Sequence, residues 1–171
     1  MISDFSFGST VSPLSGSDQP PQLEGRHAFG LQLPLVLPGK LLDLQNLAPN
    51  IAACVAHFSA LQLDWTYASE KPGPGKRAVA LLDADPETGG IWALSVLEGA
   101  GTGRHSHHAG GAYGECVITL AGELEDTLDN GKPLVLKTGA VMFHAPDTTH
   151  EARTKTFWVG LIHQPRGSTP V

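Results

Sequence analysis

Apolar and polar residues alternate along much of this chain, in short runs separated by turn-forming residues. Residues 91–97 (IWALSVL) are the clearest run, because their odd-numbered positions would share one face of a strand. Runs with strand character recur along the chain, at residues 77–83, 91–97, 115–120, 123–128, 133–137, 141–144 and 157–162. Asp129-Asn130-Gly131 predicts a hairpin, since Asn-Gly accepts the positive φ angles of a tight turn.

One apolar segment fits two structures. Residues 51–63 (IAACVAHFSALQL) suit either a buried strand or an amphipathic helix, and periodicity does not settle so short a run. Pro49-Asn50 before the segment, together with its β-branched and aromatic residues, favours a strand. The whole pattern then predicts eight or more short strands and no helix. We expect an all-β fold with antiparallel strands, a sandwich or barrel of the jelly-roll type.

The length of 171 residues fits a single domain with a core of its own. Residues 1–26 are rich in Ser, Gly and Pro and are interpreted as a flexible N-terminal arm. Residues 27–165 would then form the β-barrel domain, and residues 166–171 a C-terminal tail.

Composition excludes several classes of function. The net charge of -6 comes without a basic cluster, so we expect no nucleic-acid partner. Cys54 and Cys116 are too few for a four-cysteine zinc site and are interpreted as reduced, buried thiols. The sequence contains neither a signal-peptide pattern nor an apolar run of membrane-spanning length. The expected location is cytoplasmic, with no membrane partner.

The candidate chemistry lies in residues 99–122, GAGTGRHSHHAGGAYGECVITLAG. His105 and His107 are two positions apart, so on a strand both imidazoles would face one point. Glu115 follows, and a carboxylate beside two histidines favours iron, manganese or zinc. The alternative is a solvated loop, rich in His and Gly, that binds metal adventitiously.

Two spaced motifs make the chain resemble the cupin superfamily. In the first, five residues separate Gly99 from His105-Ser106-His107, and six residues separate Glu115 from Gly122. The second motif places a glycine eleven residues before a histidine, usually with a proline between them.

Gly139, Pro146 and His150 match this second motif. The segment GECVITLAGELED and the region around His150 look most like the cupin domain of ChrR-type anti-sigma factors and its stand-alone metal-dependent relatives. One departure is the gap of seven residues, 108–114, between His107 and Glu115, where the family normally has three or four.

The resemblance implies a barrel that binds one divalent transition metal (Fe, Zn, Mn or Ni) through His105, His107, Glu115 and His150. Three or four protein ligands would leave a position open for water or a small-molecule substrate. In the inserted loop, His108 could compete with His107, and Tyr113 could lie near the metal. His144 is either a neighbour of the site or a surface residue. Cupins are often dimers, so a homodimer is expected by analogy.

The favoured activity is oxygen-dependent cleavage of a diketone- or hydroxyketone-like substrate, because a bidentate enolate would fill two open positions on iron. A second hypothesis is a lyase or isomerase that uses a redox-inert metal, with Tyr113 or Glu115 as the catalytic base. A third is a metal- or ligand-sensing module without turnover. Val117, Thr119 and Ala121 are expected to point inward, and their small size weakly favours an enzyme.

Overall fold

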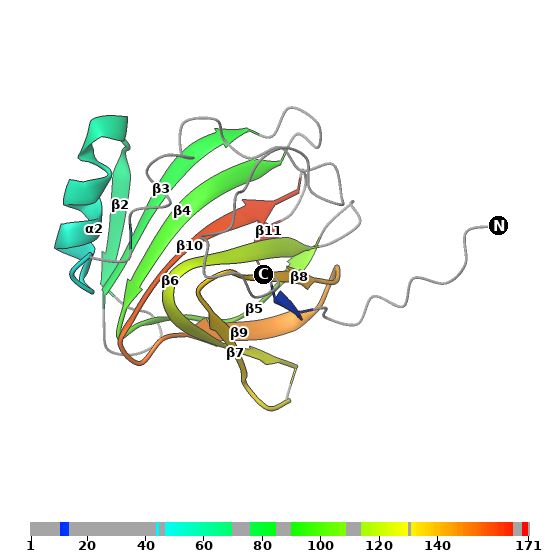
Figure 1. Ribbon diagram of the computed structural model, residues 1–171. Coiled ribbons are helices and arrows are strands. Elements are labelled where there is room, and N and C mark those ends of the chain that lie inside the picture. The colour runs from blue at the N-terminus through cyan, green and yellow to red at the C-terminus, as the bar shows by residue number, and fades with distance from the viewer. Residues whose placement is uncertain are drawn as a thin grey trace.

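The computed structural model describes residues 11–13, 44, 47–69, 76–84, 90–108, 114–129, 131–165 and 169–170. Strands dominate these ranges (Figure 1). The strands are β1 (Val11–Pro13), β2 (Trp65–Ser69), β3 (Lys76–Ala84), β4 (Ile91–Glu98), β5 (Gly101–His108), β6 (Glu115–Leu128), β7 (Leu134–Lys137), β8 (Ala140–His144), β9 (Thr149–Arg153), β10 (Phe157–Gln164) and β11 (Thr169–Pro170). The predicted runs of strand character fall on β3, β4, β6, β7, β8 and β10, whereas β1, β2, β5, β9 and β11 lie outside those runs.

All strand pairs are antiparallel, and they curl into the barrel seen in Figure 1. The main path of neighbouring strands is β11-β5-β9-β6-β10-β4-β3-β2, and β8 joins it through β6. The first half of β6 pairs with β10 and β8, and its second half pairs with β9 and β7. One continuous strand therefore belongs to both walls of the barrel. The predicted all-β, jelly-roll architecture is confirmed.

Gly122 lies where β6 passes from one wall to the other. Its φ angle is +77°, a left-handed conformation that favours glycine. A Cβ atom here would collide with the carbonyl oxygen of Phe157 on β10. The β6–β10 register also shifts at Val159/Gly160, as at a β-bulge. The bend of β6 thus depends on the absence of a side chain at Gly122.

Apolar side chains form two cores, one on each face of the larger wall. The barrel core lies inside and consists of Leu97, Ala100, Val117, Leu124, Leu136, Met142, Ala152 and Trp158. The outer core lies on the opposite face and includes Phe58, Trp92, Leu94, Val96, Ile118, Val159 and Leu161. Alternation along β4 explains this division, because Leu97 points inward while Trp92, Leu94 and Val96 point outward.

The outer core is covered by a helix where a strand was expected. Residues Ile51–His57 form α2, and residues Ser59–Leu61 form a 3-10 turn. The Asn50 side chain accepts a hydrogen bond from the Ala53 amide at 2.9 Å and so caps the helix. Ile51 and Cys54 are buried against the outer core. The strand prediction is therefore wrong, because Asn50 is an N-cap and not merely a break before a strand.

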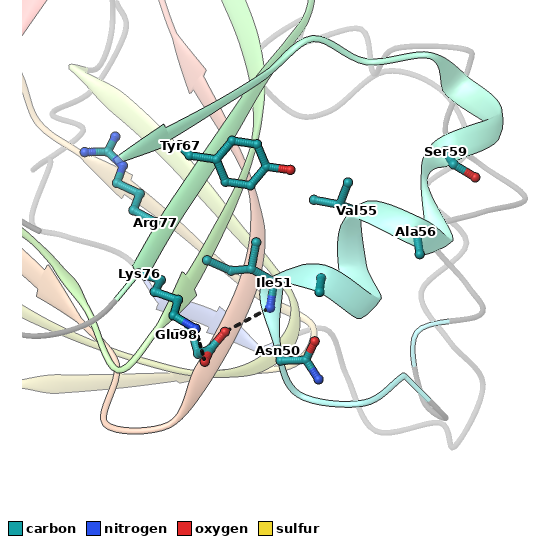
Figure 2. Close-up of a pocket in the computed structure, with 10 residues that line it drawn as sticks. Asn50, Ile51, Val55, Ala56, Ser59, Tyr67, Lys76, Arg77 and Glu98 are labelled. Atoms are coloured by element: carbon teal, nitrogen blue, oxygen red, sulfur yellow. Dashed lines mark hydrogen bonds and ion pairs between the residues drawn. The ribbon is translucent and has the colours of Figure 1, made fainter. Parts of the chain in front are cut away.

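A cavity of about 720 Å³ lies between α2 and the adjoining ends of the sheet (Figure 2). Glu98 joins the two parts, because one carboxylate oxygen accepts a hydrogen bond from the Ile51 amide at 3.1 Å and the other lies 3.7 Å from Lys76 Nζ. The cavity shares no lining residue with the histidine-rich segment. It belongs to the contact between helix and barrel.

Both predicted termini contribute a short strand to the barrel. In the expected N-terminal arm the structure describes only residues 11–13, and these form β1, paired with β8. In the expected tail, Thr169–Pro170 form β11, paired with β5. Cys54 and Cys116 are free and buried, as predicted. Among the described residues, no helix has the length and apolar character needed to cross a membrane.

Candidate metal centre

Strands β5 and β9 bring three histidines together inside the barrel. The β5–β9 register shifts between Gly101 and Gly103, and Gly103 has a φ angle of +76°. After this bulge His105 lies directly opposite His150. The His105 Nδ1 atom is 2.8 Å from the Gly103 carbonyl oxygen, so it donates there and leaves Nε2 for the interior. His107 follows on the same face of β5.

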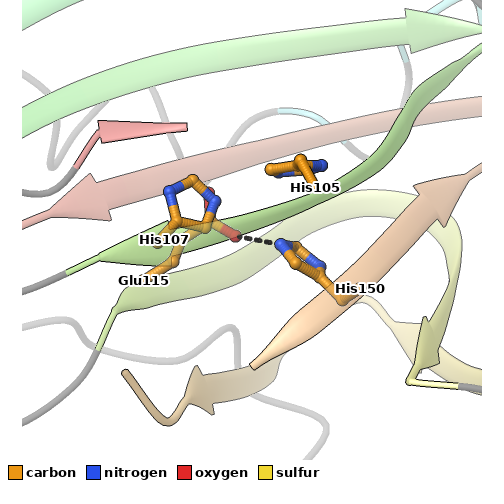
Figure 3. A group of neighbouring side chains, drawn as sticks. All are labelled: His105, His107, Glu115 and His150. Atoms are coloured by element: carbon orange, nitrogen blue, oxygen red, sulfur yellow. Dashed lines mark ion pairs between the residues drawn. The ribbon is translucent and has the colours of Figure 1, made fainter. Parts of the chain in front are cut away.

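Glu115, the first residue of β6, completes the group (Figure 3). Its Oε1 lies 3.4 Å from His107 Nε2, and its Oε2 lies 3.5 Å from His150 Nε2. One donor atom from each of His105, His107, Glu115 and His150 lies within 4.8 Å of all the others. The four residues named from the sequence motifs therefore meet at one place, although they come from three strands.

The donor atoms at this place suit a transition metal. His107, Glu115 and His150 are buried, and His105 is half-buried. Among the described residues, His150 Nε2 and both ring nitrogens of His107 are buried without a hydrogen-bond partner. Buried nitrogen atoms without partners are costly, and coordination to a cation would satisfy one nitrogen of each ring. Imidazole and carboxylate donors fit iron, zinc, manganese or nickel.

Two further residues lie behind the group. Asp126, on the second half of β6, is fully buried, and its carboxylate lies 3.2 Å from His150 Nδ1 and 3.0 Å from His144 Nε2. The other ring nitrogen of His144, Nδ1, lies 3.3 Å from Glu115 Oε2. Asp126 was not predicted from the sequence. His144 is the buried neighbour of the site and not a surface residue.

Burial and charge shift the pKa values in opposite directions within the group. Burial lowers the pKa of His107 to about 4 and also lowers that of His105. Burial would lower the pKa of His144 as well, but Asp126 and Glu115 outweigh it and raise this pKa to about 9. Hydrogen bonds from His144 and His150 outweigh burial at Asp126 and lower its pKa to about 2. The metal-free site thus combines anionic carboxylates with the cationic imidazole of His144.

The stability of the metal-free protein is expected to be highest near pH 6.5. The folded-state pKa of His107 is about 4, below its unfolded value of 6.5, so stability falls as the pH drops from 6.5 towards 4. The folded-state pKa of His144 is about 9, so its contribution is lost as the pH rises from 6.5 through 9. Urea unfolding in chelator across this range checks both limbs.

In His144→Gln the alkaline decline should disappear while the acid decline remains. Two results would contradict this assignment of charges: a stability that does not change with pH in the unchanged protein, or an alkaline decline in the variant equal to that of the unchanged protein.

A cavity of about 20 Å³ adjoins the cluster inside the barrel. Val117, Leu97 and Trp158 contribute apolar walls. Ser95 also lines the cavity, and its buried hydroxyl has no hydrogen-bond partner among the described residues. A space of this size accommodates about one water molecule. Only a small group can therefore approach the cluster from this side.

The inward positions on β6 were predicted in part. Val117 lines the inner cavity, and Thr119 is buried and accepts a hydrogen bond from Trp158 Nε1 at 3.1 Å. Ala121 instead packs against the outer core, because the register shift displaces it from the alternation. Tyr113 and the side chain of His108 lie outside the part of the chain that the structure describes.

Solved structures with a similar fold include proteins described as cupins. A cupin-2 domain from Rhodospirillum rubrum has a TM-score of 0.53 and 12% sequence identity, and the match covers 64% of this chain and 74% of that chain. A predicted oxalate decarboxylase from Thermotoga maritima has a TM-score of 0.52 and 22% identity, covering 61% and 94%. A cupin 2 conserved barrel domain protein from Rhodopseudomonas palustris has a TM-score of 0.50 and 16% identity, covering 63% and 76%.

No protein-family model matches the chain, and no curated protein matches it either. The identities to the solved structures are low, so the likeness concerns the fold alone. The chain has the cupin fold, with a cluster of His, Glu and Asp residues that could bind a metal. The resemblance predicted from the two motifs is confirmed at that level. The closer resemblance to ChrR-type domains stays a prediction.

Proposed function

We propose that this protein binds one divalent transition metal through His105, His107, Glu115 and His150. The observation that carries the proposal is the convergence of four donor atoms within 4.8 Å, in a buried place where His107 and His150 nitrogens lack other partners. Three neutral imidazoles and one carboxylate together carry one negative charge, and such a donor set stabilises a divalent cation.

The side chains around the cluster would restrict what reaches the metal. His105 is the half-buried ligand, so the open side of the site lies next to it. Val117, Leu97 and Trp158 form apolar walls on the inner side and leave space there for about one water molecule. Held in this donor set, a transition metal supplies Lewis-acid or redox chemistry. Glu115, which lies near both His107 and His150, is the candidate to hold or accept a proton from a substrate.

For the reaction we favour oxygen-dependent cleavage of a diketone- or hydroxyketone-like substrate, with iron as the metal. Support comes from the donor set of three histidines and one carboxylate, which would hold iron and leave positions on it for a substrate. A redox-inert metal would instead favour a lyase or isomerase, with Glu115 or Tyr113 as the base.

The size of the inner cavity supports a second candidate of another class, a metal-sensing module without turnover. About 20 Å³ beside the cluster leaves little space for a substrate there. Such a module would bind metal as tightly as an enzyme would. It would differ in lacking a position on the metal that exchanges with solvent or substrate.

The deciding experiment is elemental mass spectrometry on protein purified without a histidine tag. The proposal predicts about one equivalent of a transition metal per chain. Iron would be followed by oxygen-uptake assays with enolisable ketones, and zinc, manganese or nickel by lyase and isomerase assays. Metal with no turnover and no exchangeable water ligand would favour the sensing module. Protein that neither contains metal nor takes it up from solution would refute the metal site.

A further inference from the structure

We propose that Asp126 and His144 form an orienting clamp that fixes two of the four ligands, His150 and Glu115. This inference rests on the proposed metal site and deepens it. Neither clamp residue belongs to the proposed ligand set. Both are positioning residues, which act through the ligands that they contact.

The first branch of the clamp runs from Asp126 to His150. The Asp126 carboxylate lies 3.2 Å from His150 Nδ1, and His150 Nε2 has no hydrogen-bond partner among the described residues. A carboxylate can only accept, so Nδ1 carries the proton and Nε2 keeps its lone pair for a cation. Asp126 thereby selects the tautomer of His150 that can bind metal.

The second branch runs from Asp126 through His144 to Glu115. His144 Nε2 lies 3.0 Å from Asp126, and His144 Nδ1 lies 3.3 Å from Glu115 Oε2. The His144 ring is held by its hydrogen bond to Asp126, and its Nδ1 faces Glu115 at ion-pair distance. It fixes Oε2 of Glu115 and leaves Oε1, which is 3.4 Å from His107 Nε2, on the side of the other ligands.

The two branches close into a ring. The imidazoles of His144 and His150 stack with their centroids 3.9 Å apart and their planes inclined by 35°. Asp126 lies at one edge of this stacked pair and Glu115 at the other. Since Asp126 is fully buried, water cannot substitute for its two contacts. Loss of Asp126 therefore releases both rings at once.

The arrangement also explains why a fully buried carboxylate is kept inside an apolar barrel. Leu124 and Ala152 occupy neighbouring inward positions and belong to the barrel core. A carboxylate is tolerated in this core because His144 and His150 compensate it. A role in orienting the ligands accounts for a carboxylate at this position, beside the contribution that its contacts with His144 and His150 make to stability.

The test measures Co²⁺ affinity, by competition with a chelator, and the visible absorption spectrum of the Co²⁺ form. Asp126→Asn is nearly isosteric, but its amide donates to one of the two rings and so forces the wrong tautomer there. We expect binding that is about 10- to 100-fold weaker, with an altered spectrum. Asp126→Leu removes both contacts without adding a donor. We expect its Co²⁺ binding to be weakened at least as much, while the metal-free protein stays folded.

The second branch is tested with His144→Gln, which can still donate to Asp126 but does not span to Glu115. We expect weaker Co²⁺ binding, about 10-fold or more, and an altered spectrum. Glu123→Gln is the matched control for Asp126→Asn. It also changes a carboxylate to an amide, but on an exposed face of β6. It should leave affinity and spectrum unchanged.

The outcomes separate the clamp from the metal site itself. If the unchanged protein binds no Co²⁺, the proposed function fails. If it binds Co²⁺ and Asp126→Asn binds equally well with the same spectrum, the clamp is refuted while the metal site stands. A complete loss of binding in His144→Gln would make His144 a ligand and would overturn its role as a positioning residue. Urea unfolding of each metal-free variant identifies effects that come from misfolding.

Discussion

Replacement of Gly122 with alanine is expected to destabilise the barrel by about 2–5 kcal/mol. Two effects add at this position. The φ angle of +77° costs a residue with a Cβ atom about 1–2 kcal/mol. The new methyl group would also collide with the Phe157 carbonyl oxygen and would lie 3.2 Å from the Trp158 Cα atom, so β6 and β10 would have to separate. Urea unfolding of the metal-free protein measures the loss.

Gly139→Ala is the matched control for this prediction. Gly139 has a similar φ angle, +87°, but a Cβ atom there would have nothing within 4 Å. It should therefore show only the conformational cost of about 1–2 kcal/mol. The difference between the two variants isolates the collision at the bend of β6. Equal losses at both positions would mean that β6 can move away from β10 without cost.

Replacement of His150 with alanine is expected to reduce the bound metal from about one equivalent to a trace, with at least a 100-fold loss of affinity. His150 is central to the cluster, because it lies opposite His105, 3.5 Å from Glu115 Oε2 and 3.2 Å from Asp126. Its loss removes one donor and releases the carboxylate that it contacts. Elemental mass spectrometry and chelator competition measure the change.

His57→Ala provides the control for His150→Ala, since His57 lies on α2 and outside the cluster. It should retain the full metal content. The double variant His105→Ala/His150→Ala should contain no metal at all. Metal retained in the double variant would place the binding site elsewhere in the chain and would leave the two sequence motifs without a function.

The strands could be predicted because the alternation of apolar and polar residues follows directly from the pleat. Ile91, Ser95 and Leu97 share a face in β4 whichever strand lies beside it. The helix could not be predicted from apolar content alone. Ile51, Cys54 and Phe58 lie at helical spacing, and the side chain of Asn50 caps the first turn, but the same residues also fit a buried strand. The choice between helix and strand depends on packing against the outer core, which is formed by strands distant in sequence.

The histidines of the cluster could be predicted because their spacing is local or matches a family motif. Asp126 could not, because its partners His144 and His150 are distant in sequence and meet it only through the pairing of β6 with β8 and β9. One signal was present. In ELEDTL the alternation puts Asp126 on the same face as Leu124 and Leu128, so a carboxylate occupies an inward position. A charged residue at an inward position indicates a buried partner.

The place of β10 in the sheet has a consequence for the order of folding. β10 is the last of the long strands, yet it lies between β4 and β6 and pairs with both. During synthesis on the ribosome, the larger wall of the barrel therefore cannot close until Gln164 has left the exit tunnel. Such distant pairings are slow to form. Until then, β4 and β6 each lack the neighbour that joins them in the folded sheet.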